Sequence, residues 1–402
     1  FMVLADLTFI QALFESVSGW TTTGLSVLDV EVLPNSLLLF RSLMQFIGGF
    51  GLVAIMVMSL IGVGAYSGLY ESEGHDFVLP SVKKTSQVLF MFYIGFTVMG
   101  VVAYILVGMP WFDAINHSMS AISTGGFSVR NDSIGSYQSL GIEIVTLILM
   151  ILGSLNFAVY ILILKGKSRL ITRLDDNRFF ILLLSIFLPL LAYLMVQLLY
   201  IPLPSSIRTA VFEGVSALTT TGYSISDYAV YPAGIILIFI TIMLIGGQSG
   251  STSGGIKMTR MNLIVKNLVF TIRRVFQPEH RVTDNVTQGP TGAKMIHKED
   301  MNSVYNFAFL YILTLIVGTW ILTLEGFSLQ AALFEFASTI GTVGLSVGVV
   351  SASLSNLSYS AMIIGMFLGR LEFFVVIVVF IKISKDAIAV LASSKSHLKN
   401  SK

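Results

Sequence analysis

The stretch Ser216-Ala-Leu-Thr-Thr-Thr-Gly-Tyr-Ser224 recurs in related form at three other places in the chain. All four copies fit the pattern Ser-x-x-(Thr/Ser/Gly)-Thr-x-Gly-(Leu/Phe/Tyr)-Ser, with a period of roughly 100 residues. One such stretch could be an ordinary turn between helices, but four regularly spaced copies indicate a chain built from repeated units. The other copies are Ser18–Ser26, Ser120–Ser128 and Ser338–Ser346.

The composition around these copies is that of a membrane protein. Of the 402 residues, 54% are hydrophobic and only 11% are charged, and the mean hydropathy is +0.84. A water-soluble globular domain does not tolerate such a composition, so we expect a lipid bilayer as partner and no nucleic acid. Helices that cross a hydrocarbon core of about 30 Å are predicted at Ser86–Gly108, Phe179–Ile201 and Ser303–Leu324.

The 24 lysine and arginine residues predict the orientation in a cell membrane. If the hydrophobic runs alternate across the bilayer, nearly all of these residues lie on one side, which is then the cytoplasm. That side holds Lys83 and Lys84, the group Lys165–Arg178, the stretch Lys257–Lys298 and the tail beyond Lys382. The exceptions are Arg41, Arg130 and Arg208 on the other side and Arg370 inside a span. The four copies are therefore predicted on the extracellular side and the C-terminus in the cytoplasm.

The spacing of the copies predicts parallel repeats. Two hydrophobic spans separate each copy from the next, so all four return to the same face, whereas inverted repeats need an odd number of spans. A short amphipathic stretch precedes each glycine and is too short to span, which favours a re-entrant half-helix. The predicted fold is an all-α membrane protein with four helix–pore-loop–helix repeats in pseudo-fourfold symmetry around one central pore. The half-helices are expected at Leu7–Gly19, Trp111–Ser123, Ser205–Thr219 and Ser328–Ile340.

The repeat units are predicted at residues 1–65, 66–170, 171–282 and 283–402. The first unit contains a pore helix, a filter and an inner helix, and its outer helix would have to precede Phe1. We therefore expect the natural chain to begin earlier. The third unit has a broken inner helix, and the fourth carries a cytoplasmic tail.

The glycine of each copy points to cation binding by backbone oxygens. Potassium sheds its water only where other oxygens replace it, and a ring of carbonyls does so without a fixed negative charge. Glycine allows backbone angles that turn carbonyls inward, and the neighbouring hydroxyls can tie the loop to its half-helix. We call the four copies the filter segments. The predicted potassium-binding residues are Thr22, Thr23, Gly24, Thr124, Gly125, Gly126, Thr220, Thr221, Gly222, Thr342, Val343 and Gly344.

The third inner segment changes from apolar Tyr231–Ile245 to a run of small polar residues, where a continuous helix is not expected. Irregular backbone at membrane depth must face protein or a water-filled cavity, so this run is predicted to form a flexible obstruction below the filter. The predicted gate consists of Gly246, Gly247, Gln248, Ser249, Gly250, Ser251, Thr252, Ser253, Gly254, Gly255 and Arg370.

Arg370 lies about 18 Å into the helix predicted at Ser358–Ile381, near the middle of the membrane, at ~1.5 Å per residue. A charge at that depth costs about 2.5–3.5 kcal/mol on insertion scales and normally faces a partner or water. Glu372 points to another side of the helix. Two interpretations stay open: Arg370 hinders cations and anchors the gate, or it pairs with a distant carboxylate.

Glutamates occupy one equivalent position in three half-helices, at Glu15, Glu213 and Glu335, and the second half-helix has His117 there. We expect these groups to fasten helix ends or to shape the outer potential. Binding of ions in the filter is the less favoured alternative.

At the four filter segments the sequence resembles the Trk/Ktr/HKT superfamily of potassium transporters, most closely the bacterial TrkH-like pore subunits. The resemblance covers essentially the whole chain and includes Gln45–Gly51, Gly246–Lys257 and Leu368–Glu372. In that family four filter glycines accompany a preference for potassium and a serine in the first repeat accompanies sodium transport, so Gly24 implies potassium uptake. The resemblance also implies a homodimer and a cytosolic TrkA/KtrA-like ring of nucleotide-binding regulatory subunits.

Enzymatic chemistry finds no support in the sequence. The chain has no cysteine, and its five histidines show no metal-ligand spacing, so potassium is the only expected ion and no organic cofactor is expected. Gly250 and Gly255 have the spacing of a phosphate-binding loop and Lys257 follows shortly after. However, Ile256 separates Gly255 from Lys257, no Ser or Thr follows Lys257 directly, and a membrane span precedes the run. Two rivals stay open: a sodium-conducting or cation-coupled symporter of the same architecture, and a membrane receptor or scaffold without transport.

Overall fold

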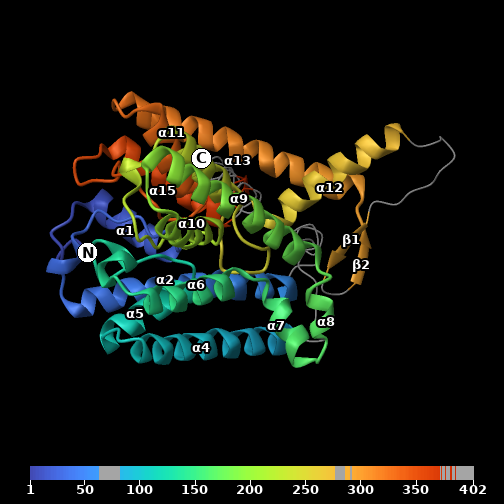
Figure 1. The fold of residues 1–402 in the computed structure, drawn as a ribbon, viewed down its shortest axis with the longest axis horizontal. Coiled ribbons are helices and arrows are strands. Elements are labelled where there is room, and N and C mark those ends of the chain that lie inside the picture. The colour runs from blue at the N-terminus through green and yellow to red at the C-terminus, as the bar shows by residue number, and fades with distance from the viewer. Residues whose placement is uncertain are drawn as a thin grey trace, which may run out of the picture.

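The computed structural model describes residues 1–62, 82–276, 286–289 and 292–371, together with positions 373, 376, 381, 382 and 385. Most of these residues are helical (Figure 1). Three expectations lie outside the described residues: the unit boundaries at 65/66 and 282/283, the position of Glu372, and most of the tail beyond Lys382. The boundary at 170/171 falls inside the short helix α8 (Ser168–Ile171).

Three long apolar helices confirm the predicted spans. They are α4 (Val82–Leu106), α9 (Asp175–Leu199) and α13 (Lys298–Leu324), and each is long and apolar enough to cross a membrane. Their outward faces expose large apolar side chains such as Met91, Ile181 and Phe309. Exposed apolar faces along helices of this length are favourable in contact with lipid chains and unfavourable in contact with water. The chain is therefore a membrane protein.

Four short helices lie where half-helices were predicted. They have 12 to 16 residues and are largely buried at their C-terminal ends. Pro110 and Pro202 stand directly before two of them, and proline suits the start of a helix because its fixed φ is already helical. The short helices are α1 (Phe9–Trp20), α5 (Trp111–Ile122), α10 (Leu203–Leu218) and α14 (Leu329–Ile340).

The helices that follow the filter segments are of two kinds. α2 (Asn35–Gly62) and α15 (Asn356–Leu371) run without a break. α11 (Ala233–Ile245) ends where the break was predicted, and α12 (Met258–Val275) continues the chain beyond it. The second such helix is also broken, because α6 (Leu140–Ser154) and α7 (Phe157–Leu164) meet at an angle of 92°. This second break was not predicted.

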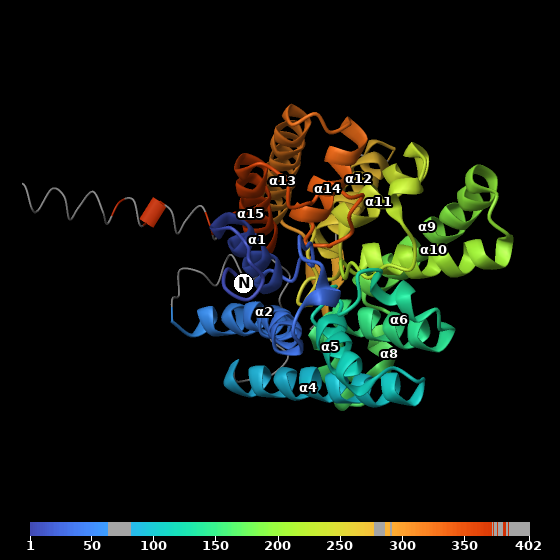
Figure 2. The same ribbon diagram turned by 90° about the vertical axis from the view of Figure 1, so that its left-hand side faces the viewer.

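The packing of the short helices closes a circle. α5, α10 and α14 each pack against the long helix before them, and every short helix packs against the helix that follows its filter segment. Each also packs against the corresponding helix of the preceding unit: α5 on α2, α10 on α6, α14 on α11, and α1 on α15. Viewed from one end, the helices surround a common centre (Figure 2). The first and last units of the chain are therefore neighbours.

Glycines let the inner helices approach the short ones closely. Gly48 in α2, Gly153 in α6 and Gly369 in α15 each face the carbonyl oxygen at the end of their own short helix, and a Cβ there would stand closer than 3.0 Å. The carbonyls belong to Trp20, Ile122 and Ile340. At the matching place of the third unit stands Gly246, where α11 ends.

A small hairpin departs from the predicted all-α fold. β1 (Val286–Gly289) pairs antiparallel with β2 (Gly292–Met295). It lies near α8 and α12, at the end of the molecule opposite the N-terminus (Figure 1). Asp175 at the start of α9 holds it, accepting hydrogen bonds from Gln288 N at 2.5 Å and Thr287 Oγ1 at 3.1 Å. Strands of four residues held by such a distant contact give little periodic signal in a sequence.

Candidate functional site

The four filter segments have the same backbone course. Each short helix ends in a residue near the right-handed region, and the next residue is a threonine with positive φ. Left-handed backbone costs an ordinary residue roughly 1–2 kcal/mol, so surrounding contacts must hold it in place. The glycine two residues later also has positive φ. The threonines are Thr22, Thr124, Thr220 and Thr342, at 55°, 50°, 54° and 48°, and the glycines are Gly24, Gly126, Gly222 and Gly344, at 90°, 77°, 83° and 94°.

The four glycines lie against one another in a closed ring. A Cβ added to any of them would stand closer than 3.0 Å to a backbone carbonyl oxygen of the next segment. These carbonyls belong to Gly125, Thr221, Val343 and Thr23, taken in the order Gly24, Gly126, Gly222 and Gly344. No larger residue fits without displacing backbone. All twelve predicted filter residues therefore gather around one centre.

The first serine of each copy stabilises the course of its filter segment through hydrogen bonds. In each copy the backbone N–H of the residue before the glycine donates to the carbonyl of the first serine, at 2.8–3.0 Å. The hydroxyls of Ser18 and Ser216 donate back to the residue after the glycine, both at 2.6 Å. In the fourth copy Gly344 N donates to Ser338 Oγ at 3.0 Å. Repetition of these bonds explains why the pattern recurs.

Gln45 of α2 supports the second filter segment and was not assigned a role from the sequence. Its Nε2 donates to the Gly125 carbonyl at 2.5 Å, while its Oε1 accepts from Ser120 Oγ at 2.5 Å and from Phe127 N at 3.1 Å. The side chain is fully buried. It thus replaces the serine hydroxyl contact of the other copies.

The equivalent glutamates fasten the chain after the filter. Glu15 accepts from Ser26 Oγ and Val27 N, at 2.8 and 2.6 Å. Glu335 accepts from Ser346 Oγ and Val347 N, at 2.8 and 3.1 Å. The other two positions act alike: Glu213 accepts from Ile225 N and Ser226 Oγ, both at 2.8 Å, and His117 Nε2 lies 3.0 Å from Ser128 Oγ.

Arg41 is buried rather than exposed in a loop. Its Nη2 lies 3.6 Å from a Glu15 carboxylate oxygen and donates to Ser26 Oγ at 2.8 Å. The guanidinium stands 4.0 Å above the Phe127 ring. One of the three cations expected on the extracellular side therefore braces the first two filter segments.

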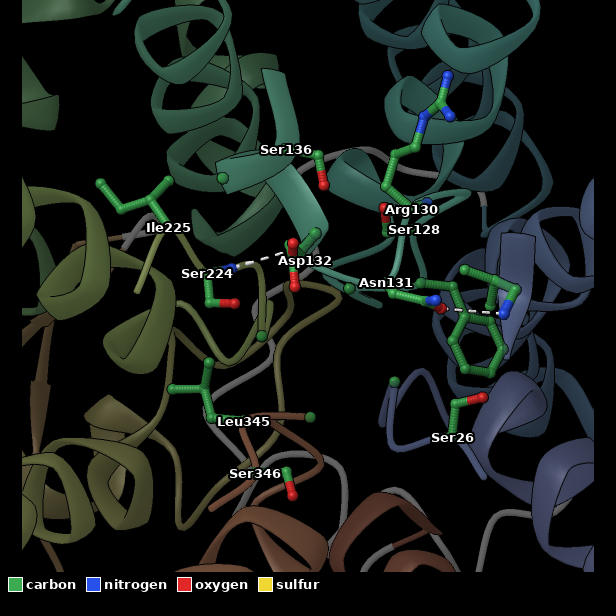
Figure 3. A pocket seen from close by; sticks show the side chains of 18 of the residues that line it. Ser26, Ser128, Arg130, Asn131, Asp132, Ser136, Ser224, Ile225, Leu345 and Ser346 are labelled. Atoms are coloured by element: carbon green, nitrogen blue, oxygen red, sulfur yellow. Dashed lines mark hydrogen bonds between the residues drawn. The ribbon is translucent and has the colours of Figure 1, made fainter. Parts of the chain in front are cut away.

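A cavity of about 940 Å³ opens above the glycine ring. All four glycines line it, together with the residues that follow them. Figure 3 shows Ser26, Ser128, Ser224 and Ser346 around this cavity, one from each filter segment. Polar groups thus surround the approach to the ring from every side.

Charged side chains stand at the rim of this cavity. Arg130 lies 3.4 Å from Asp113, whose carboxylate also accepts a hydrogen bond from Tyr137 at 2.6 Å. Burial and this bond to Asp113 raise the pKa of Tyr137, so the phenol stays a neutral donor.

The predicted gate forms a closed, buried loop, which we call the gate loop (residues 246–255). Its two ends touch, because a Cβ on Gly246 would stand closer than 3.0 Å to the Gly254 carbonyl oxygen. Ile256 N donates to Leu244 O at 3.0 Å, and Met258 N donates to Gly247 O at 2.8 Å. Positive φ at Gly246, Gly250 and Gly255 lets the chain reverse within so few residues.

The gate loop lies against the inner end of the filter segments. Gly254 N donates to Thr220 Oγ1 at 2.7 Å, and Thr124 Oγ1 lies 3.1 Å from Thr252 Oγ1. A Cβ on Gly254 would overlap Thr342 Oγ1. In each segment the threonine precedes the glycine by two residues, and the cavity is lined by the glycines and by residues after them. The gate loop and the cavity are therefore on opposite sides of the ring.

Three side chains anchor the gate loop. Arg370 Nη1 donates to the Thr252 carbonyl, and no described carboxylate pairs with this guanidinium. Lys257 Nζ donates to the Ser253 carbonyl. Gln248 bridges two distant elements, donating to Asn177 Oδ1 at 2.7 Å and accepting from Asn156 N at 2.9 Å.

The gate loop forms hydrogen bonds with the second break, between α6 and α7. Asn156 N donates to Gln248, and Phe157 N donates to the Gly250 carbonyl at 3.0 Å. Asn156 also caps α7 by accepting from Ala158 N at 2.8 Å. Asn156 and Asn177 carry no periodic or motif signal, so sequence reasoning did not find them.

The chain is similar to known proteins in sequence and in fold. Residues 3–389 match the TrkH family model, described as a cation transport protein. The chain is 34% identical over 387 residues to the Trk system potassium uptake protein TrkG of Escherichia coli (strain K12), covering 93% of this chain and 79% of TrkG. It is 30% identical over 390 residues to the Trk system potassium uptake protein TrkH of Halomonas elongata, covering 94% and 79%. The crystal structure of the potassium transporter TrkH from Vibrio parahaemolyticus matches with a TM-score of 0.80 at 26% identity, covering 93% of this chain and 78% of that one.

Proposed function

The chain belongs to the TrkH family of cation transport proteins, and we propose that it takes up potassium ions through a pore along the axis of the glycine ring. As a member of a transporter family it is not an enzyme. The potassium uptake proteins among its relatives support the choice of ion.

The closed ring of four glycines carries the proposal. Each glycine packs on a carbonyl of the next segment, so backbone oxygens from all four segments surround one axis. Carbonyl oxygens can replace the water of a dehydrated potassium ion, and their dipoles favour a cation without trapping it as a carboxylate would. The proposed potassium ligands are the predicted filter residues. Sodium remains the alternative ion for the same architecture.

Four parallel repeats in pseudo-fourfold symmetry are the proposed architecture. The circular packing of the short helices supports it, since α1 packs against α15 in the same way as α5 packs against α2. The shared φ values of the threonines and glycines support it as well. We propose the same unit limits as the sequence indicates.

The gate loop is proposed to close this pore from the cytoplasmic side. It is buried and touches the inner threonines, and its side chains are polar and mostly small. It therefore obstructs the path without large apolar contacts that would resist movement. Arg370 adds a positive charge and a hydrogen bond to the loop. In this proposal Arg370 holds the closed position and repels cations.

We propose that the cavity faces the extracellular side and that the hairpin lies on the cytoplasmic side. The distribution of lysine and arginine supports this orientation. We further propose a homodimer that docks a cytosolic TrkA/KtrA-like ring of nucleotide-binding subunits, as the resemblance implies. The basic groups at Lys165–Arg178 and on α12 can contact such a ring or anionic lipid.

A flux assay in liposomes tests the proposal. Purified protein should admit rubidium, a potassium substitute, faster than sodium. A Gly222→Ala variant should lose this preference, because its Cβ collides with the Val343 carbonyl and the ring must widen or tilt. Comparable rubidium and sodium rates would favour the sodium-conducting alternative. A rubidium rate equal to that of empty vesicles, with and without a regulatory subunit, would remove the pore.

A further inference from the structure

The inner end of the filter is a ring of four threonine hydroxyls. Thr22, Thr124, Thr220 and Thr342 stand at the same position of their segments, and all are fully buried. The gate loop provides hydrogen-bond partners for Thr124 and Thr220. Within the part of the chain that the structure describes, the hydroxyls of Thr22 and Thr342 have no hydrogen-bond partner.

Unpartnered buried hydroxyls call for a physical reason. Leaving a buried donor or acceptor without a partner costs about 1–3 kcal/mol, and such groups in native proteins commonly serve an ion, a water or a functional motion. Oxygens of hydroxyls are suitable ligands for potassium. The four-membered ring thus has the chemistry of a cation site at the end of the filter nearest the gate loop.

The gate loop uses the same oxygens in a way that opposes a cation. Gly254 N–H directs its positive end at Thr220 Oγ1, where a cation would also need a lone pair. Gly254 is so close to Thr342 Oγ1 that a single methyl group would overlap it. Arg370 adds a guanidinium that donates to the Thr252 carbonyl of the same loop. With the loop in this position, a cation at the inner ring would lack space and would meet positive charge.

We infer that the gate loop and a cation at the inner threonine ring compete, so that the loop seats only when this end of the filter holds no cation. The inference rests on the proposed function and adds a regulation of the same pore by its own cargo. Potassium that reaches the inner ring displaces the loop, and a seated loop weakens binding there by the same factor. A cation binding only the released state multiplies the ratio of released to seated loop by 1 + [K⁺]/Kd.

The absence of cysteine from the sequence provides a clean reporter. Ser253 is fully buried in the gate loop and its hydroxyl has no hydrogen-bond partner in the described structure, so Ser253→Cys removes no bond and introduces a single thiol among these 402 residues. The variant in detergent is treated with a small charged thiosulfonate reagent over a series of potassium concentrations. N-methylglucamine chloride keeps the ionic strength constant. The labelling rate should rise ~10-fold at a potassium concentration ten times Kd.

Two further variants in this background separate competition from a remote effect. The loop makes no described hydrogen bond to the Thr22 hydroxyl, which is a proposed cation ligand, so Thr22→Val should reduce the rise in labelling rate with potassium, measured against the variant's own potassium-free rate. The loop does touch Thr124, so Thr124→Val should raise the rate already without potassium. A rise with potassium that survives Thr22→Val undiminished would assign the effect to another ion site and overturn the inference.

Rubidium flux of the same reporter variant in liposomes distinguishes a failure of the competition from a failure of the proposed pore. Labelling that is independent of potassium, in protein that still carries rubidium, would overturn the competition and leave the pore intact. Protein that carries no rubidium under any condition would instead contradict the proposed function.

Discussion

Gly344 lies against the carbonyl of Thr23, so the last filter segment of the chain meets the first. A Cβ on Gly344 would stand closer than 3.0 Å to the Thr23 carbonyl oxygen, and α1 packs against α15 around the same junction. Without this contact the segments would form an open row. Because each glycine touches its neighbour in the same way, a change in one segment must displace the next.

Gly24→Ser should lower the ratio of rubidium to sodium flux. The new Cβ would collide with the Gly125 carbonyl oxygen, and φ at this position is +90°, so the ring must widen or tilt. Gly108→Ser is the matched control, because Gly108 has φ of +93° and a Cβ added there would have no atom within 4 Å. Flux of both ions in liposomes measures the ratio. An unchanged ratio for Gly24→Ser would contradict a discriminating role of the first segment.

Gly254→Ala should increase rubidium flux without a regulatory subunit. The added methyl group overlaps Thr342 Oγ1 and the Gly341 carbonyl, and overpacking of this kind costs about 1–3 kcal/mol, or roughly 5- to 150-fold in the ratio of released to seated loop. Gly234→Ala in α11 is the control, since a Cβ added at Gly234 would also have no atom within 4 Å. If Gly254→Ala conducts no faster than Gly234→Ala, the loop does not obstruct the pore.

Arg370→Ala should also raise flux, because it removes the hydrogen bond to Thr252 and the positive charge together. Arg370→Gln keeps a donor and loses only the charge, so a smaller increase would assign most of the effect to anchoring. Deleting residues from the gate loop should act in the same direction. Combination with Gly254→Ala should be less than additive, since both changes release the same element. Equal or lower flux in well-folded Arg370→Ala protein would refute the role.

The elements predicted well are those whose signal is local. The short helices, the spans and the break after Ile245 each follow from an uninterrupted change in hydropathy or in glycine content. The break at Leu155 and the β-hairpin were missed because residues distant in sequence, Gln248 and Asp175, hold them. The repeated pattern picked out the residues that gather at the glycine ring, but their order around the ring required the structure.

Gln45→Leu should destabilise the protein and reduce selectivity. It leaves Gly125 O, Ser120 Oγ and Phe127 N without the partner they now share, at about 1–3 kcal/mol for each buried group left unpaired. Gln87→Leu at the exposed start of α4 controls for the loss of an amide. Thermal unfolding in detergent and the flux ratio measure the two effects. A melting temperature and a ratio equal to those of Gln87→Leu would remove Gln45 from the support of the filter.

The start of α9 connects the gate loop to α12 and to the hairpin. Asp175 accepts from the hairpin and pairs with Lys266 of α12, Asp176 accepts from Thr259 of α12 at 2.6 Å, and Asn177 accepts from Gln248 of the loop. The three consecutive residues 175–177 thus contact the hairpin, α12 and the gate loop. A displacement of α12 or the hairpin reaches the loop within one turn of helix.

Asn177→Ala should therefore raise rubidium flux, by less than Arg370→Ala. It removes one acceptor from Gln248, a loss of about 1 kcal/mol or roughly fivefold in the ratio of released to seated loop, while the bond between Asn156 N and Gln248 Oε1 remains. Thr259→Val cuts a bond between α12 and α9 without touching the loop, so alone it should leave basal flux unchanged. If Thr259→Val opens the pore as far as Asn177→Ala, then α12 holds the loop by a route other than Asn177. If neither variant changes flux, the start of α9 does not communicate with the gate loop.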